Sequence, residues 1–168
     1  MEILWTPWRL SYVTGVENAG SGGCVFCEAA RPSSVHDDLV LVRGALCFVI
    51  LNRYPYTNGH LMVVTNRHVA TLRAAADEER AELIQLMTCA EAALSEAYNP
   101  QGLNVGFNLG RPAGAGIADH LHAHLVPRWV GDTSFISVVG HTRVLPEELG
   151  QTAARLRPIF ERLIKGAG

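Results

Sequence analysis

Residues 120–126 of this 168-residue chain alternate between histidine and apolar side chains, and this alternation constrains the fold more than any other feature. A repeat of two residues is the period of a β-strand, in which successive side chains point to opposite faces of a sheet. We therefore expect His120, His122 and His124 on one face, about 6 to 7 Å apart, with buried apolar residues on the other. Three such imidazoles serve either catalysis or metal binding, and the pattern alone leaves both open.

Other segments predict further strands and two main helices. One helix is expected from Asp77, as its N-cap, to Asn99, and a second after residues 146–148, with Pro158 as a kink. The apolar face of the first helix consists of Leu83, Met87, Ala90 and Leu94. Short apolar runs predict strands at residues 39–42, 46–51, 60–64 and 103–108. Strands in hairpins with helices in separate blocks indicate an α+β fold with an antiparallel sheet.

Composition indicates a globular protein, because 48% of the residues are hydrophobic and 18% are charged. The formal net charge of −2 gives no support for general binding to nucleic acid or to a membrane surface. No apolar run approaches the roughly 20 residues that span a bilayer, and no signal peptide is recognisable, so we expect a cytoplasmic protein. Cys47 and Cys89 lie in apolar segments and agree with a reducing compartment.

The first 23 residues are expected to dock onto a folded surface. They carry Trp5, Pro7, Trp8 and Tyr12 and run into a glycine-rich linker. Aromatic side chains in an irregular segment favour packing against the chain's own domain or against a partner subunit. We therefore divide the chain into a docking segment, residues 1–23, and a single domain, residues 24–168, which includes the C-terminal helix.

The loop before the histidine strand, residues 110–116, is rich in glycine and alanine. Gly114, Ala115 and Gly116 leave their backbone N–H groups uncovered by bulky side chains, which suits binding of phosphate oxygens. A glycine-rich loop alone is a weak signal, because glycine is common in turns. A loop of this kind that leads into an alternating histidine strand is a stronger indication of a nucleotide site.

On these residues the chain resembles the histidine-triad (HIT) family, whose signature is His-x-His-x-His with apolar residues between. Residues 120–126 (HLHAHLV) fit it fully, and residues 48–60 (FVILNRYPYTNGH) resemble the family's first sequence block. The resemblance covers residues 24–132 and implies a HIT-like fold, an antiparallel sheet with two main helices. It implies that Asn52 contacts a nucleoside ribose and that His60 is the fourth histidine of the substrate site. Without the triad, both would read as ordinary turn residues.

The resemblance also implies a mechanism. His122 would attack the α-phosphorus of a nucleotide and form a nucleotidyl-histidine, and His124 would assist at the phosphate or at the departing group. Backbone groups of residues 114–116 would stabilise the phosphoryl oxygens. Asn108 would orient the phosphate chain, although an asparagine at a strand end needs no such role. The hexose-1-phosphate nucleotidylyltransferase branch carries glutamine at the third histidine, so His124 argues against that branch.

Cys24 and Cys27 form a CxxC motif, which by itself is either part of a metal site or a redox pair. No thioredoxin-like βαβ pattern surrounds it, which weakens the redox interpretation. A structural zinc needs four ligands, usually cysteine and histidine. Some bacterial HIT proteins complete such a motif with two histidines, and the resemblance implies that these are His68 and His120. Zinc is therefore the expected cofactor.

Residues 5–9, 127–136 and 142–147 resemble the bacterial branch named for diadenosine tetraphosphate phosphorylases. The resemblance implies nucleotidyl transfer or hydrolysis on dinucleoside polyphosphates. Phosphorylases of this branch carry serine where this chain has Gly116, so phosphate and water both stay open as acceptors.

Two alternatives use the same residues. One is a hydrolase of nucleoside phosphoramidates or other adenylyl conjugates. The other is a nucleotide-binding module with little turnover, for which His122 would have no purpose. The family resemblance further implies a homodimer that pairs through a sheet edge.

Overall fold

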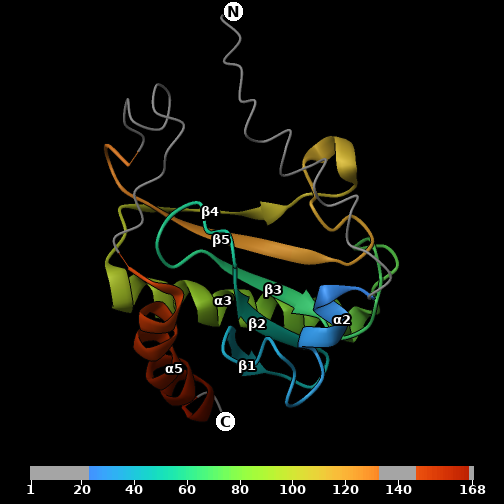
Figure 1. The fold of residues 1–168 in the computed structure, drawn as a ribbon, viewed down its shortest axis with the longest axis horizontal. Coiled ribbons are helices and arrows are strands. Elements are labelled where there is room, and N and C mark those ends of the chain that lie inside the picture. The colour runs from blue at the N-terminus through green and yellow to red at the C-terminus, as the bar shows by residue number, and fades with distance from the viewer. Residues whose placement is uncertain (1–22, 133–146, 167–168) are drawn as a thin grey trace, which may run out of the picture.

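The computed structural model describes residues 23–132 and 147–166 and contains a five-stranded antiparallel sheet (Figure 1). Across the sheet the strands follow the order β1-β2-β3-β5-β4, and every neighbouring pair is antiparallel. The strands are β1 (Val40–Arg43), β2 (Cys47–Leu51), β3 (Leu61–Thr65), β4 (Gly102–Phe107) and β5 (His122–Arg128). The expected α+β fold with an antiparallel sheet is confirmed.

Two long helices lie together on one side of the sheet. α3 (Asp77–Tyr98) crosses behind the strands in Figure 1 and packs on β2, β3 and β5, while α5 (Leu149–Lys165) packs on α3 and β1. The short helix α2 (Val25–Ala29) lies in front of the sheet, and the 3-10 helix η2 (Arg111–Ala113) lies in the loop between β4 and β5. The long helices therefore leave the front face to α2 and to loops.

The core lies between the sheet and the two long helices. β2 and β3 are buried along their whole length, which explains why their sequences are continuous apolar runs without alternation. Leu83, Ala90 and Leu94 of α3 are buried as expected, and Met87 is partly buried against the core. None of the helices in the described ranges is long and apolar enough to cross a bilayer.

The helix starts differ slightly from the expected ones. Ala76, and not Asp77, is the N-cap of α3, and the Glu79 carboxylate accepts a hydrogen bond from the Ala76 N–H at 2.7 Å. Glutamate at the third helical position therefore supplies one half of a capping box, while the alanine N-cap has no side-chain acceptor for the other half. Glu148 is the N-cap of α5, and Pro158 lies inside that helix.

Two differences concern the candidate site. β5 begins at His122, so the regular alternation expected from residue 120 covers only His122 and His124. Residues 25–29 form a helix that the CxxC spacing did not indicate. The proposed docking segment, apart from Gly23, lies outside the described residues, as do residues 133–146.

Candidate active site

β5 places two of the three triad histidines beside one another on the face that α2 covers. Val64 of β3 pairs with His122, while Met62 of β3 and Gly106 of β4 both pair with His124. Directly paired residues point to the same face of a sheet. A Cβ atom added to Gly106 would meet nothing within 4 Å, so the space beside His124 is open on the side of β4.

The His122 ring is held in one tautomer by the backbone. Its Nδ1 lies 2.7 Å from the carbonyl oxygen of His120, and because a carbonyl only accepts, Nδ1 carries the proton. The Nε2 lone pair of the neutral ring is then left for attack on an electrophile. The His122 side chain is buried, which lowers its pKa, and the hydrogen bond to His120 partly opposes that effect.

A chain of hydrogen bonds fixes the tautomer of His124. The Tyr56 N–H donates to His60 Nδ1 at 3.1 Å, so the proton of His60 lies on Nε2. That Nε2 lies 3.0 Å from His124 Nδ1, which must accept, and the His124 proton therefore lies on Nε2. Burial, and secondarily the neighbouring His122, lower the pKa of His124 to about 4. Near neutral pH His124 thus presents a neutral N–H donor.

The loop between β2 and β3 places His60 behind His124. Gly59 has a φ of +75°, and a Cβ atom there would lie 3.0 Å from the Tyr98 ring, so both conformation and space require glycine. The Thr57 hydroxyl donates to the Pro127 carbonyl at 2.8 Å and ties the loop to β5. His60 is only 1% exposed, so it can act on a substrate only through His124.

Asn52 begins this loop, at the end of β2. Its Oδ1 accepts from the Tyr54 N–H at 2.9 Å, and its Nδ2 lies 3.4 Å from each ring nitrogen of His60. The side chain is 8% exposed. The amide therefore closes a turn and lies against His60 in the structure.

The glycine-rich loop is closed by its own backbone. The Gly114 N–H donates to the Arg111 carbonyl at 2.9 Å, and the Ala115 N–H points to the Gly110 carbonyl at 3.4 Å. Within the described part of the chain, the Gly116 N–H has no protein acceptor. Of the three residues expected to bind phosphate, Gly116 is therefore the one whose backbone N–H is available to a ligand. Asn108 lies just past the end of β4, where the register continues towards His122.

Four residues expected to bind metal converge at the start of β5. The ligand atoms of Cys24, Cys27, His68 and His120 all lie within 4.8 Å of one another. His120 Nδ1 is 3.3 Å from the Cys24 sulfur and 3.6 Å from that of Cys27, and His68 Nδ1 is 3.2 Å from the Cys27 sulfur. In a tetrahedral zinc site, bond lengths of about 2.3 Å to sulfur and 2.0 Å to nitrogen put these atoms about 3.5 Å apart. Donor type and spacing both fit zinc.

A family model described as HIT domain matches residues 33–130, more than half of the chain, including His60, the glycine-rich loop and β5. This chain belongs to the HIT domain family. An AP-4-A phosphorylase of Mycobacterium tuberculosis is 40% identical over 168 residues, which cover 96% of this chain and 86% of the relative. The adenosine 5'-monophosphoramidase hnt1 of Schizosaccharomyces pombe is 29% identical over 62% of this chain and 74% of its own length.

Solved structures agree with the HIT fold. A Zn-bound histidine triad family protein from Mycobacterium smegmatis superposes with a TM-score of 0.70 at 26% identity, over 88% of this chain and 99% of that protein. A hypothetical histidine triad nucleotide-binding protein from Sulfolobus tokodaii superposes with a TM-score of 0.65, also at 26% identity, over 85% and 93% of the two chains.

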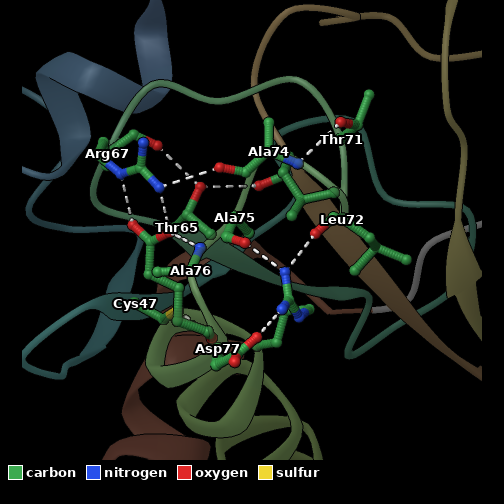
Figure 2. Close-up of polar contacts among 12 residues, drawn as sticks. Cys47, Thr65, Arg67, Thr71, Leu72, Ala74, Ala75, Ala76 and Asp77 are labelled. Carbon is green, nitrogen blue, oxygen red and sulfur yellow. Dashed lines mark hydrogen bonds and ion pairs between the residues drawn. The ribbon is translucent and has the colours of Figure 1, made fainter.

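In this HIT domain, polar contacts tie the segment that follows β3 to the start of α3 (Figure 2), and the same segment carries His68. The Thr65 carbonyl accepts from His120 Nε2 at 2.7 Å, which leaves Nδ1 of that ring for a metal. Arg67, next to His68, donates two hydrogen bonds to the buried Glu79 carboxylate, at 2.9 and 2.6 Å. Arg67 holds the pKa of Glu79 below its usual range. The ion pair thus ties the segment that carries His68 to the first turn of α3.

Sequence reasoning missed several members of this HIT site. Phe26, which lies inside the CxxC motif, packs its ring against His120 and His122. The spacing of the motif showed that the two cysteines converge, but it could not show where the residue between them points. Thr65 and Glu79 support the metal cluster through contacts with residues distant in sequence. Only the position of Arg67 next to His68 could have pointed to such support.

Proposed function

We propose that this HIT domain cleaves dinucleoside polyphosphates by transferring a nucleotidyl group through His122. One observation carries the proposal: Nδ1 of His122 is committed to the His120 carbonyl, so Nε2 is the nitrogen free for attack. The 40% identity to an AP-4-A phosphorylase over 96% of the chain supports this substrate class.

In the first step His122 Nε2 forms a bond to an α-phosphorus of diadenosine tetraphosphate. The bond from that phosphorus to its bridging oxygen breaks, and ATP leaves with the electron pair. The His124 Nε2–H donates a hydrogen bond to the departing oxygen, where negative charge develops. The Gly116 N–H binds an oxygen of the transferred phosphoryl group, and Asn108 and Asn52 orient the substrate on either side.

In the second step an acceptor attacks the phosphorus and the bond to His122 breaks. Inorganic phosphate as acceptor gives ADP, and water gives AMP. We favour phosphate because of the similarity to a phosphorylase, although Gly116 lacks a hydroxyl that would bind the incoming phosphate.

The test is to incubate the protein with diadenosine tetraphosphate, with and without phosphate, and to identify the nucleotides. ATP and ADP formed only with phosphate support phosphorolysis, and ATP and AMP formed without it mean that water is the acceptor. His122→Ala should abolish turnover by either route. An active His122→Ala variant would remove His122 as the nucleophile.

A second candidate function uses the same nucleophile on nucleoside phosphoramidates. It is favoured by the similarity to the phosphoramidase hnt1, at 29% identity over 62% of the chain. Only the leaving group differs, because an amine departs in place of a nucleotide. The kcat/KM values for adenosine 5'-monophosphoramidate and diadenosine tetraphosphate show which of the two activities is preferred. If the protein turns over neither substrate, a nucleotide-binding module is favoured.

The four-residue cluster is proposed to hold a structural zinc ion. Cys24, Cys27, His68 and His120 would supply two sulfur and two nitrogen ligands, and a site with four protein ligands leaves no position for a substrate. Zinc would join α2, the segment after β3 and the start of β5. Metal analysis of protein purified without added zinc tests the site: Cys24→Ser should lose the metal, and Cys89→Ser, as a control, should keep it.

The partner is proposed to be a second copy of the chain, paired along β4. β4 is an edge strand in which no residue is buried, and Val105 on it is 49% exposed. Exposed apolar edge strands are sites of pairing. Light scattering of the purified protein tests the dimer, and Val105→Lys should shift it towards the monomer.

A cytoplasmic location is also proposed, because the cysteines of the described residues are all free thiols, as is usual in a reducing compartment.

A further inference from the structure

Phe26 occupies an unusual position between the metal cluster and the nucleophile. It lies in α2 between Cys24 and Cys27, and its side chain is 4% exposed. Its ring contacts His120 edge-on, with centroids 5.5 Å apart and an interplanar angle of 76°. It also contacts His122, at 5.0 Å and 50°. One aromatic ring therefore touches both a proposed zinc ligand and the proposed nucleophile.

The His122 ring is confined by three contacts. The hydrogen bond from Nδ1 to the His120 carbonyl fixes one edge of the ring. The His124 ring lies 4.9 Å away at 76°, and the Phe26 ring lies 5.0 Å away. The hydrogen bond sets the tautomer, but a single bond leaves the imidazole free to tilt about it. The flanking rings remove that freedom.

We propose that Phe26 is a positioning residue for the nucleophile, held against the His122 ring by the CxxC helix so that Nε2 faces the phosphorus. The inference rests on the proposed function, in which His122 attacks. Phe26 does not itself contact substrate, because a side chain that is 4% exposed offers almost no surface for a base or a ribose.

The cysteines on either side connect this role to the metal. α2 has only five residues, and a helix of that length has little stability of its own. Its buried apolar contacts come from Phe26 and Ala29. Zinc bound through Cys24 and Cys27 would anchor both ends of the stretch that carries Phe26. When bound, zinc would thus influence the position of His122 only through the Phe26 ring, and Cys24 and Cys27 would hold it away from the substrate.

The experiment compares Phe26→Ala and Phe26→Leu with Phe160→Leu in the full-length zinc-loaded protein. Phe160 is a matched control, since it is a fully buried phenylalanine of α5. Because small misplacements of a reacting group cost up to about 100-fold in rate, we expect kcat of Phe26→Ala to fall on the order of 10- to 100-fold, with KM changed less than about twofold. Phe26→Leu keeps more of the volume and should lose less, and Phe160→Leu should keep kcat.

A second readout does not depend on turnover. Nitrogen NMR of the histidine rings distinguishes the Nδ1–H from the Nε2–H form, and wild-type His122 should give a single Nδ1–H signature. In Phe26→Ala the His122 ring signals should shift and broaden because the ring tilts, with the Nδ1–H form kept, while the zinc content stays at one ion per chain. Removing zinc from the wild type with a chelator should cause the same change.

Three results would overturn the inference: an unchanged kcat in Phe26→Ala, a loss confined to KM, or an equal loss in Phe160→Leu. If Phe26→Ala does not fold, the decision rests on Phe26→Leu and on the chelated wild type. An active His122→Ala variant is a different outcome, because it removes the proposed function itself.

Discussion

His60 Nε2 lies 3.0 Å from His124 Nδ1, and this contact determines which nitrogen of His124 faces the substrate. The Tyr56 N–H fixes the proton of His60, and His60 in turn fixes that of His124. His60, which is too buried to contact a ligand, thereby determines that His124 presents a hydrogen-bond donor to the substrate.

The first prediction concerns this relay. His60→Ala should lower kcat about 10- to 100-fold, because His124 then no longer has its N–H directed at the departing oxygen. His60→Gln can donate through its amide and should recover part of the loss. Steady-state kinetics of the two variants check this, and equal losses in both would argue against a role for the donated proton.

The second prediction concerns pH. Burial lowers the pKa of His124 from 6.5 to about 4, so the folded protein keeps this ring neutral where the unfolded chain binds a proton. Stability from this group is therefore complete above pH 6.5 and is lost as the pH falls towards 4. One group contributes at most about 1.4 kcal/mol per pH unit in that window. Denaturant unfolding at several pH values should show a shallower fall for His124→Gln than for the wild type.

The third prediction concerns the support of the metal cluster. Glu79→Gln keeps the size of the side chain but removes the charge that holds Arg67, the neighbour of His68. Zinc affinity should fall about 10- to 100-fold, as is usual when groups behind metal ligands are lost. Asp77→Asn is the control, because Asp77 pairs with Arg80 on the exposed side of the same turn. Competition with a chromogenic chelator measures both, and equal affinities would leave Glu79 as a helix cap only.

The fourth prediction concerns the acceptor. Gly116→Ser adds a hydroxyl next to the Gly116 N–H, which has no protein partner among the described residues. This hydroxyl can hydrogen-bond to an incoming phosphate, so the ratio of ADP to AMP formed from diadenosine tetraphosphate should rise several-fold, about the effect of one hydrogen bond. Product analysis at fixed phosphate concentration checks it, and an unchanged ratio would place the acceptor elsewhere.

Sequence patterns predicted the sheet because its strands are short apolar runs bounded by turn residues, and the long helices because their apolar residues recur on one face. In the metal cluster, Cys24 and Cys27 were predicted from the spacing of the CxxC motif, whereas His68 and His120 were predicted from the family resemblance. The start of β5 was predicted two residues early. His120 has the alternating pattern of a strand residue, but its ring is held by the Thr65 carbonyl and lies beside the two cysteines.

Contacts between distant segments account for what the sequence could not predict. The Phe26 ring reaches residues nearly a hundred positions away, and nothing in its neighbours indicates this. The relay from Tyr56 to His124 depends on a backbone N–H, which every residue except proline possesses. The N-cap of α3 was misplaced because an acidic residue was expected at the cap, whereas Glu79 caps from inside the helix.

His120 contributes to the site through its side chain and through its main chain, and mutation affects these two contributions differently. Its ring points to the metal cluster, while its carbonyl accepts a hydrogen bond from the His122 Nδ1–H. Mutation can replace the ring but cannot remove a main-chain carbonyl. Descendants of this chain could therefore lose or regain the metal without losing the group that orients the nucleophile, provided that other contacts keep that stretch of backbone in place.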